Sequence, residues 1–123
     1  MFSRLRDAYL WANAIRLCRQ KTYEISRSEL LKMSSYSRGF SEYYALLATL
    51  NLILGEVDEA EKLFLISIKS GCPRKTEYRD YIDNYCNYYL KSISGNEGAK
   101  TRCLETALRM PAPSIIREWL PLS

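Results

Sequence analysis

The sequence predicts an all-α protein built from antiparallel helical hairpins, and three features of its 123 residues indicate this fold. Apolar residues recur three and four positions apart, which is the helical period, and show no convincing alternation at two. Residues that interrupt helices recur regularly and leave segments of about 15 residues between them, and none of these segments contains proline. The interruptions fall at 34–39, Gly55, 71–73, 94–96 and 111–113.

The first hairpin is expected over residues 3–34, with helices near 3–19 and 23–34. Leu10, Ala14 and Leu17 follow one another at helical spacing in the first of these helices. Residues 20–26 form the turn region and the start of the second helix, which continues through Leu30.

The second hairpin is expected over residues 41–70, with helices near 41–54 and 57–70. Leu46, Leu50 and Leu54 repeat at the helical period in the first helix. Asp58 and Glu59 lie in the first turn of the second helix, where carboxylates interact favourably with the helix dipole. Gly71 and Pro73 then end that helix.

The third hairpin is expected over residues 75–110, with helices near 75–92 and 96–110, and a short capping helix is expected at 113–120. Tyr81, Tyr85 and Tyr88 continue a stripe that begins at Tyr78, which favours ring packing between helices. Trp119 and its apolar neighbours give residues 113–120 one apolar side. All of these elements are assigned to a single domain, 1–123.

Residues 44–73 carry an ordered set of small and apolar positions. Tyr44, Leu47, Ala48 and Asn51 are followed by Gly55 at the turn. The second half of the set is Ala60, Phe64, Ser67 and the dipeptide 72–73. In this order and spacing the segment resembles a tetratricopeptide repeat, a helical hairpin of about 34 residues.

Counting back one repeat length from Ala48, Ala60 and Phe64 gives a weaker second copy, in which Ala14, Ser26 and Leu30 keep the required size. Small residues are needed there because the paired helices approach within about 8–10 Å. The complete signature is Ala14, Ser26, Leu30, Tyr44, Leu47, Ala48, Gly55, Ala60 and Phe64. The resemblance implies a right-handed stack of about three hairpins, although the register of the third is ambiguous because Gly95 and Ala99 follow Gly55 and Ala60 at two different offsets.

Stacks of this family expose the first helix of each hairpin on a concave face, so the resemblance implies a largely apolar groove. Its expected residues are Ala8, Trp11, Ile15, Cys18, Arg19, Ala45, Thr49 and Leu52. Such a groove suits an amphipathic helix or an apolar segment of a partner protein. The size and groove are similar to those of the small tetratricopeptide chaperones of bacterial type III secretion, so a cytoplasmic chaperone or adaptor is the expected function.

Several function classes are disfavoured by composition. The chain has no histidine, which removes the commonest general base and metal ligand. Its five glycines form no phosphate-binding loop. Cys18, Cys72, Cys86 and Cys103 have no metal-ligand spacing and are expected to be reduced core residues. We therefore expect no catalytic residues, no metal, no cofactor and no small-molecule substrate.

The charges leave two other functions open. Residues 1–40 hold eight Lys and Arg against three Asp and Glu, whereas residues 41–73 hold two against five. This alternation suits a protein partner or self-association better than a continuous phosphate track. A nucleic-acid-binding regulator and a structural subunit of a larger assembly remain the alternatives, and no membrane span is expected because the apolar run 43–54 is too short.

Overall fold

The computed structural model describes residues 2–34, 41–70 and 76–109, and its regular structure there consists of α-helices. The helices are α1 (Phe2–Arg19), α2 (Tyr23–Leu31), α3 (Ser41–Ile53), α4 (Val57–Lys69), α5 (Thr76–Ser94) and α6 (Glu97–Arg109). The prediction of an all-α protein is confirmed for these residues. The cap expected at 113–120 lies outside them.

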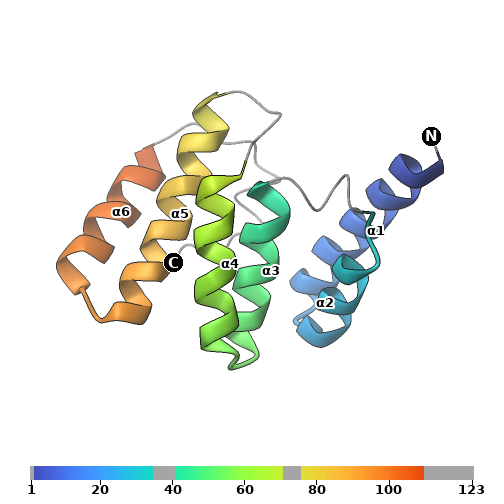
Figure 1. The fold of residues 1–123 in the computed structure, drawn as a ribbon, viewed down its shortest axis with the longest axis horizontal. Helices are drawn as coiled ribbons and strands as arrows, with labels where there is room; N and C mark the ends of the chain where they lie inside the picture. The colour runs from blue at the N-terminus through green and yellow to red at the C-terminus, as the bar shows by residue number, and fades with distance from the viewer. Residues whose placement is uncertain (1, 35–40, 71–75, 110–123) are drawn as a thin grey trace.

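The helices pack in the order in which they follow along the chain. α1 packs on α2, α3 on α4 and α5 on α6, while α2 also contacts α3 and α4 contacts α5. Figure 1 shows the α1–α2 pair at one end of the molecule, α3–α4 in the middle and α5–α6 at the other end. α3 also contacts α5, so the first helices of the second and third pairs meet directly.

Helix bounds agree with the predicted ones to within two residues, except at the end of α2. This helix was expected to reach residue 34 but ends at Leu31. The amides of Lys32 and Met33 donate to carbonyls only three residues earlier, at 3.2 and 3.1 Å. The chain therefore tightens into a turn after Leu31, as helix ends commonly do.

The three turns within the helix pairs have the same backbone geometry. Each contains one residue in the left-handed region: Lys21 with φ 61°, Gly55 with φ 88° and Gly95 with φ 78°. In each turn the amide of that residue donates to the carbonyl three residues earlier, and the next amide donates to the carbonyl five residues earlier. This is the Schellman ending of a helix. The interval from Lys21 to Gly55 equals the shift between the two sequence copies, whereas the interval from Gly55 to Gly95 is longer.

Small residues lie where the helices of the first two pairs cross. Ala14 and Ser26 in the first pair, and Ala48 and Ala60 in the second, have no exposed surface. The hydroxyl of Ser26 donates to the carbonyl oxygen of Ala14 at 2.7 Å, which ties α2 to α1. Side chains of this size let helix backbones approach closely.

The third pair lacks this small-residue contact. The second and third pairs can be aligned by matching their turn glycines, Gly55 and Gly95. In this alignment, Tyr88 takes the place of Ala48, and Lys100 takes the place of Ala60. The Nζ atom of Lys100 lies 5.3 Å from the centre of the Tyr88 ring, a cation–π contact. A large ring and a long cation thus replace two small residues at this crossing.

Aromatic residues fill the junction between the second and third pairs. The rings of Phe64 and Tyr89 stack with centres 5.5 Å apart and planes inclined by 1°. Tyr85 has no exposed surface, and its hydroxyl lies 2.5 Å from the Thr49 hydroxyl of α3. Rings of this size bury large apolar areas and dominate core packing.

The expected signature residues are mostly in this core. Seven of them are buried: Ala14, Ser26, Leu30, Leu47, Ala48, Ala60 and Phe64. Tyr44 is half-buried, and Gly55 is exposed at its turn. Within the described ranges, none of the helices combines the length and the apolar character needed to cross a membrane.

A candidate protein-binding cleft

The residues expected to line a concave groove do not share one environment. Ala45 has no exposed surface and Thr49 is 2 % exposed, because α5 packs on this side of α3 and the Tyr85 hydroxyl bonds to Thr49. Ile15 is also buried, at 3 % exposure. These three side chains therefore face the core rather than an open groove.

Five residues of the expected groove keep exposed surface. Trp11, Cys18 and Leu52 are half-buried and pack against the core with part of their surface. Ala8 and Arg19 are exposed. A role of these five residues in binding a partner stays a prediction.

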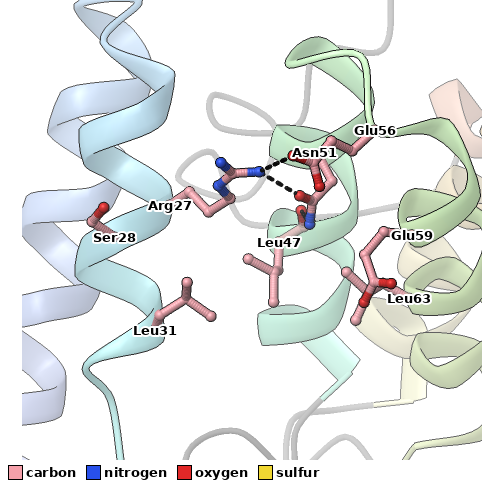
Figure 2. Close-up of a pocket in the computed structure, with 8 residues that line it drawn as sticks. All are labelled: Arg27, Ser28, Leu31, Leu47, Asn51, Glu56, Glu59 and Leu63. Atoms are coloured by element: carbon pink, nitrogen blue, oxygen red, sulfur yellow. Dashed lines mark hydrogen bonds and ion pairs between the residues drawn. The ribbon is translucent and has the colours of Figure 1, made fainter.

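The structure instead opens a cleft of about 350 Å³ between the first and second helix pairs. One wall is α2, the floor is α3 and the other wall is α4. The lining residues are Arg27, Ser28, Leu31, Leu47, Asn51, Glu56, Glu59 and Leu63. Figure 2 shows Arg27 reaching from α2 towards Asn51 and Glu56, while Leu31 and Leu47 face each other across the gap.

The cleft lies on the opposite side of α3 from the expected groove. Successive residues of an α-helix are rotated by about 100°, so residues two apart point in roughly opposite directions. Leu47 lies between Ala45 and Thr49 in sequence and accordingly faces away from both. Sequence reasoning assigned Leu47 to the repeat signature and missed the cleft. A usable signal was the pair Arg27 and Leu31, a polar and an apolar residue one turn apart on α2.

Arg27 spans the cleft because the side chain of Asn51 is held in place. The side-chain nitrogen of Asn51, Nδ2, donates to the backbone carbonyl of Leu47 at 3.1 Å. This bond directs the side-chain oxygen of Asn51, Oδ1, towards α2. The Nη1 atom of Arg27 donates to this oxygen at 2.8 Å and lies 3.5 Å from a carboxylate oxygen of Glu56. The Arg27 guanidinium is therefore engaged by two acceptors within the chain.

Glu59 gives the rim of the cleft an uncompensated negative charge. It lies in the first turn of α4 and is exposed. Within the described part of the chain it forms no ion pair or hydrogen bond. With Arg27 paired to Glu56, the lining combines the apolar side chains Leu31, Leu47 and Leu63 with one available carboxylate.

Two of the described thiols, Cys18 and Cys86, have no features of reactive groups. Burial raises the pKa of the Cys86 thiol to about 12, and burial also raises the pKa of Cys18 above its ordinary value. Both are therefore protonated near neutral pH, and a protonated thiol is a poor nucleophile. Residues 2–34, 41–70 and 76–109 contain no group of three or more Cys, Asp or Glu residues arranged to hold a metal ion.

Comparison of the chain with protein-family models, with curated proteins and with solved structures finds no match in any of the three.

Proposed function

We propose that this chain is a non-catalytic protein-binding module whose cleft between α2 and α4 takes an amphipathic helix of another polypeptide. The observation that carries the proposal is the composition of the cleft. Three leucines, Leu31, Leu47 and Leu63, lie between two helical walls, and the carboxylate of Glu59 stands beside them without a partner among the described residues. Apolar anchors with a charged edge are the recognition features of helix-in-groove binding.

Leu31 is the main apolar surface that the cleft offers. It is 50 % exposed, whereas Leu47 and Leu63 are each 7 % exposed. Covering the exposed half of a leucine stabilises a complex by about 1 kcal/mol. Small-molecule recognition has less support, because the guanidinium of Arg27 is already bound to Asn51 and Glu56.

The tetratricopeptide-like stack is part of the same proposal. Two features repeated along the chain support the stack. Turns of one geometry recur at Lys21, Gly55 and Gly95, and small residues are buried in the first two helix pairs. A chaperone of type III secretion and a cytoplasmic location stay predictions from the resemblance. A nucleic-acid ligand is disfavoured at this cleft because Glu59 would repel phosphates.

The proposal can be tested by selecting binders from a displayed library of helical peptides. We expect the selected peptides to share apolar residues at i and i+4 and a Lys or Arg beside them. Leu31→Glu places a charge on the apolar wall and should abolish their binding. Ile25→Glu is a matched control, since Ile25 lies on the same helix, is 55 % exposed and does not line the cleft.

Because both side chains are at least half exposed, both variants should remain folded, and their helical circular dichroism should equal that of the parent. Peptides that bind the Leu31→Glu variant as well as the parent would show that the cleft is not the binding site. Failure to select any peptide that distinguishes Leu31→Glu from Ile25→Glu would equally refute the proposal.

A further inference from the structure

α1 presents a continuous apolar stripe to solvent. Leu5 is 66 % exposed and Tyr9, one helical turn later, is 69 % exposed. Ala8 and Ala12 are also exposed and complete the spacing i, i+3, i+4, i+7. Residues at this spacing lie on one face of a helix. A stripe of this kind is the pattern with which helices occupy grooves on other proteins.

The exposed charges beside this stripe are positive. Arg6 is exposed and forms no hydrogen bond or ion pair within the described residues. Arg16, one turn beyond Ala12, is also exposed. Asp7 is the one acidic residue of α1, but it is 4 % exposed and accepts a hydrogen bond from the Ser34 amide at 2.9 Å. α1 therefore offers a partner an apolar face with a basic edge.

The cleft has the complementary chemistry. Its apolar side chains lie beside Glu59, which is exposed and without a partner in the described ranges. Arg6 is likewise unpaired there, so each surface carries the charge that the other lacks. Complementary charges at the edge of an apolar contact fix the orientation of the two partners.

We infer that a second copy of this chain occupies the cleft, with the α1 stripe of one molecule seated between α2 and α4 of the next and with Arg6 paired to Glu59. This inference rests on the proposed helix-binding role of the cleft. The stripe does not reach the cleft of its own chain. α1 is fixed on α2 through Ser26 and Ala14, and α2 separates α1 from the space that Arg27 crosses.

Pairing of two α1 stripes with each other is disfavoured by charge, because it would bring the arginines of both copies together. Docking of the stripe in the cleft uses two different surfaces. Such a contact is heterologous, so each molecule can accept one neighbour and dock on another, which builds rings or open chains. We therefore expect the mass of the protein in solution to rise with concentration.

Sedimentation equilibrium from micromolar to millimolar concentration tests the inference. Arg6→Glu disables the stripe and Glu59→Arg disables the cleft, and each should weaken self-association by about 100-fold. In a mixture of the two variants, every stripe-to-cleft contact between unlike molecules joins opposite charges, so the mixture should associate although each variant alone does so only weakly. The double variant Arg6→Glu/Glu59→Arg restores opposite charges and should associate again.

A wild-type protein that stays monomeric over this range overturns the inference, as does association that Glu59→Arg leaves unchanged. The peptide selection is repeated on the Arg6→Glu variant, whose cleft is intact. If this variant binds peptides and the wild type is monomeric, the inference of self-association is wrong but the proposed helix-binding role stands. Absence of both would contradict the proposed function as well.

Discussion

The left-handed position of the first turn gives a quantitative test of the repeated geometry. Lys21 has φ 61°, whereas the equivalent positions in the other two turns are Gly55 and Gly95. An L-residue in the left-handed region costs about 1–2 kcal/mol, while glycine adds about 0.5–1 kcal/mol of backbone entropy to the unfolded chain. Lys21→Gly should therefore raise the free energy of unfolding by about 0.5–1 kcal/mol.

Replacing the glycine at the equivalent position of the second turn is expected to lower the free energy of unfolding. A Cβ atom built on Gly55 meets no atom within 4 Å, so Gly55→Ala changes backbone strain without a steric clash. It should lower the free energy of unfolding by about 0.5–1 kcal/mol. Lys21→Ala is the control, because alanine keeps the strained Cβ, and the Lys21 side chain forms no hydrogen bond or ion pair within the described residues.

Urea unfolding followed by circular dichroism measures these changes, since a shift of the midpoint at constant slope reports stability. Thermal midpoints should move by roughly 2–6 °C in the same directions. A destabilised Lys21→Gly variant, or a stabilised Gly55→Ala variant, would refute the assignment of these residues to equivalent left-handed positions.

Three further outcomes are expected. Tyr85→Phe removes a buried hydrogen bond to Thr49 and should lower the free energy of unfolding by about 1 kcal/mol in urea melts; an unchanged midpoint would contradict the bond. Burial raises the pKa of Cys86 to about 12, so its thiol should stay unmodified by a thiol reagent at pH 8, whereas the half-buried Cys103 should react. Peptide mass spectrometry measures the labelling of each cysteine, and equal labelling in the native state would argue against burial of Cys86. Burial raises the pKa of Tyr89 from 10.0 to about 12, so the free energy of unfolding should fall as the pH rises from 10 towards 12. Tyr89→Phe should make this fall smaller. An equal fall in the free energy of unfolding of the variant would refute the shift.

The sequence was sufficient to predict which segments are helical, because that property is local. The helical spacing of Leu46, Leu50 and Leu54 and the glycines at 55 and 95 place helices and turns to within a few residues. The end of α2 was the exception, since no glycine or proline marks the turn that follows Leu31.

The candidate site could not be predicted in the same way, because it depends on contacts between distant segments. Thr49 lies on a face of α3 that would be open in an isolated hairpin. Tyr85, on α5, covers that face and bonds to Thr49. The opposite face of α3 forms the floor of the cleft at Leu47 and Asn51, and Arg27 of α2 bonds to Asn51 there.

The difference between the two junctions explains where the cleft lies. Between the second and third pairs, aromatic rings fill the space, as the stack of Phe64 on Tyr89 shows. Between the first and second pairs, polar side-chain links among the described residues include Arg27 to Asn51 at 2.8 Å and the Tyr43 hydroxyl to the Leu30 carbonyl at 3.2 Å. Hydrogen bonds fix a distance between helices without filling the volume between them, whereas close-packed rings do both. The junction between the second and third pairs has hydrogen bonds as well, such as that between Tyr85 and Thr49, but stacked rings also fill its space. The junction between the first and second pairs retains the open volume of the cleft, and the proposed partner helix would add its apolar contacts there.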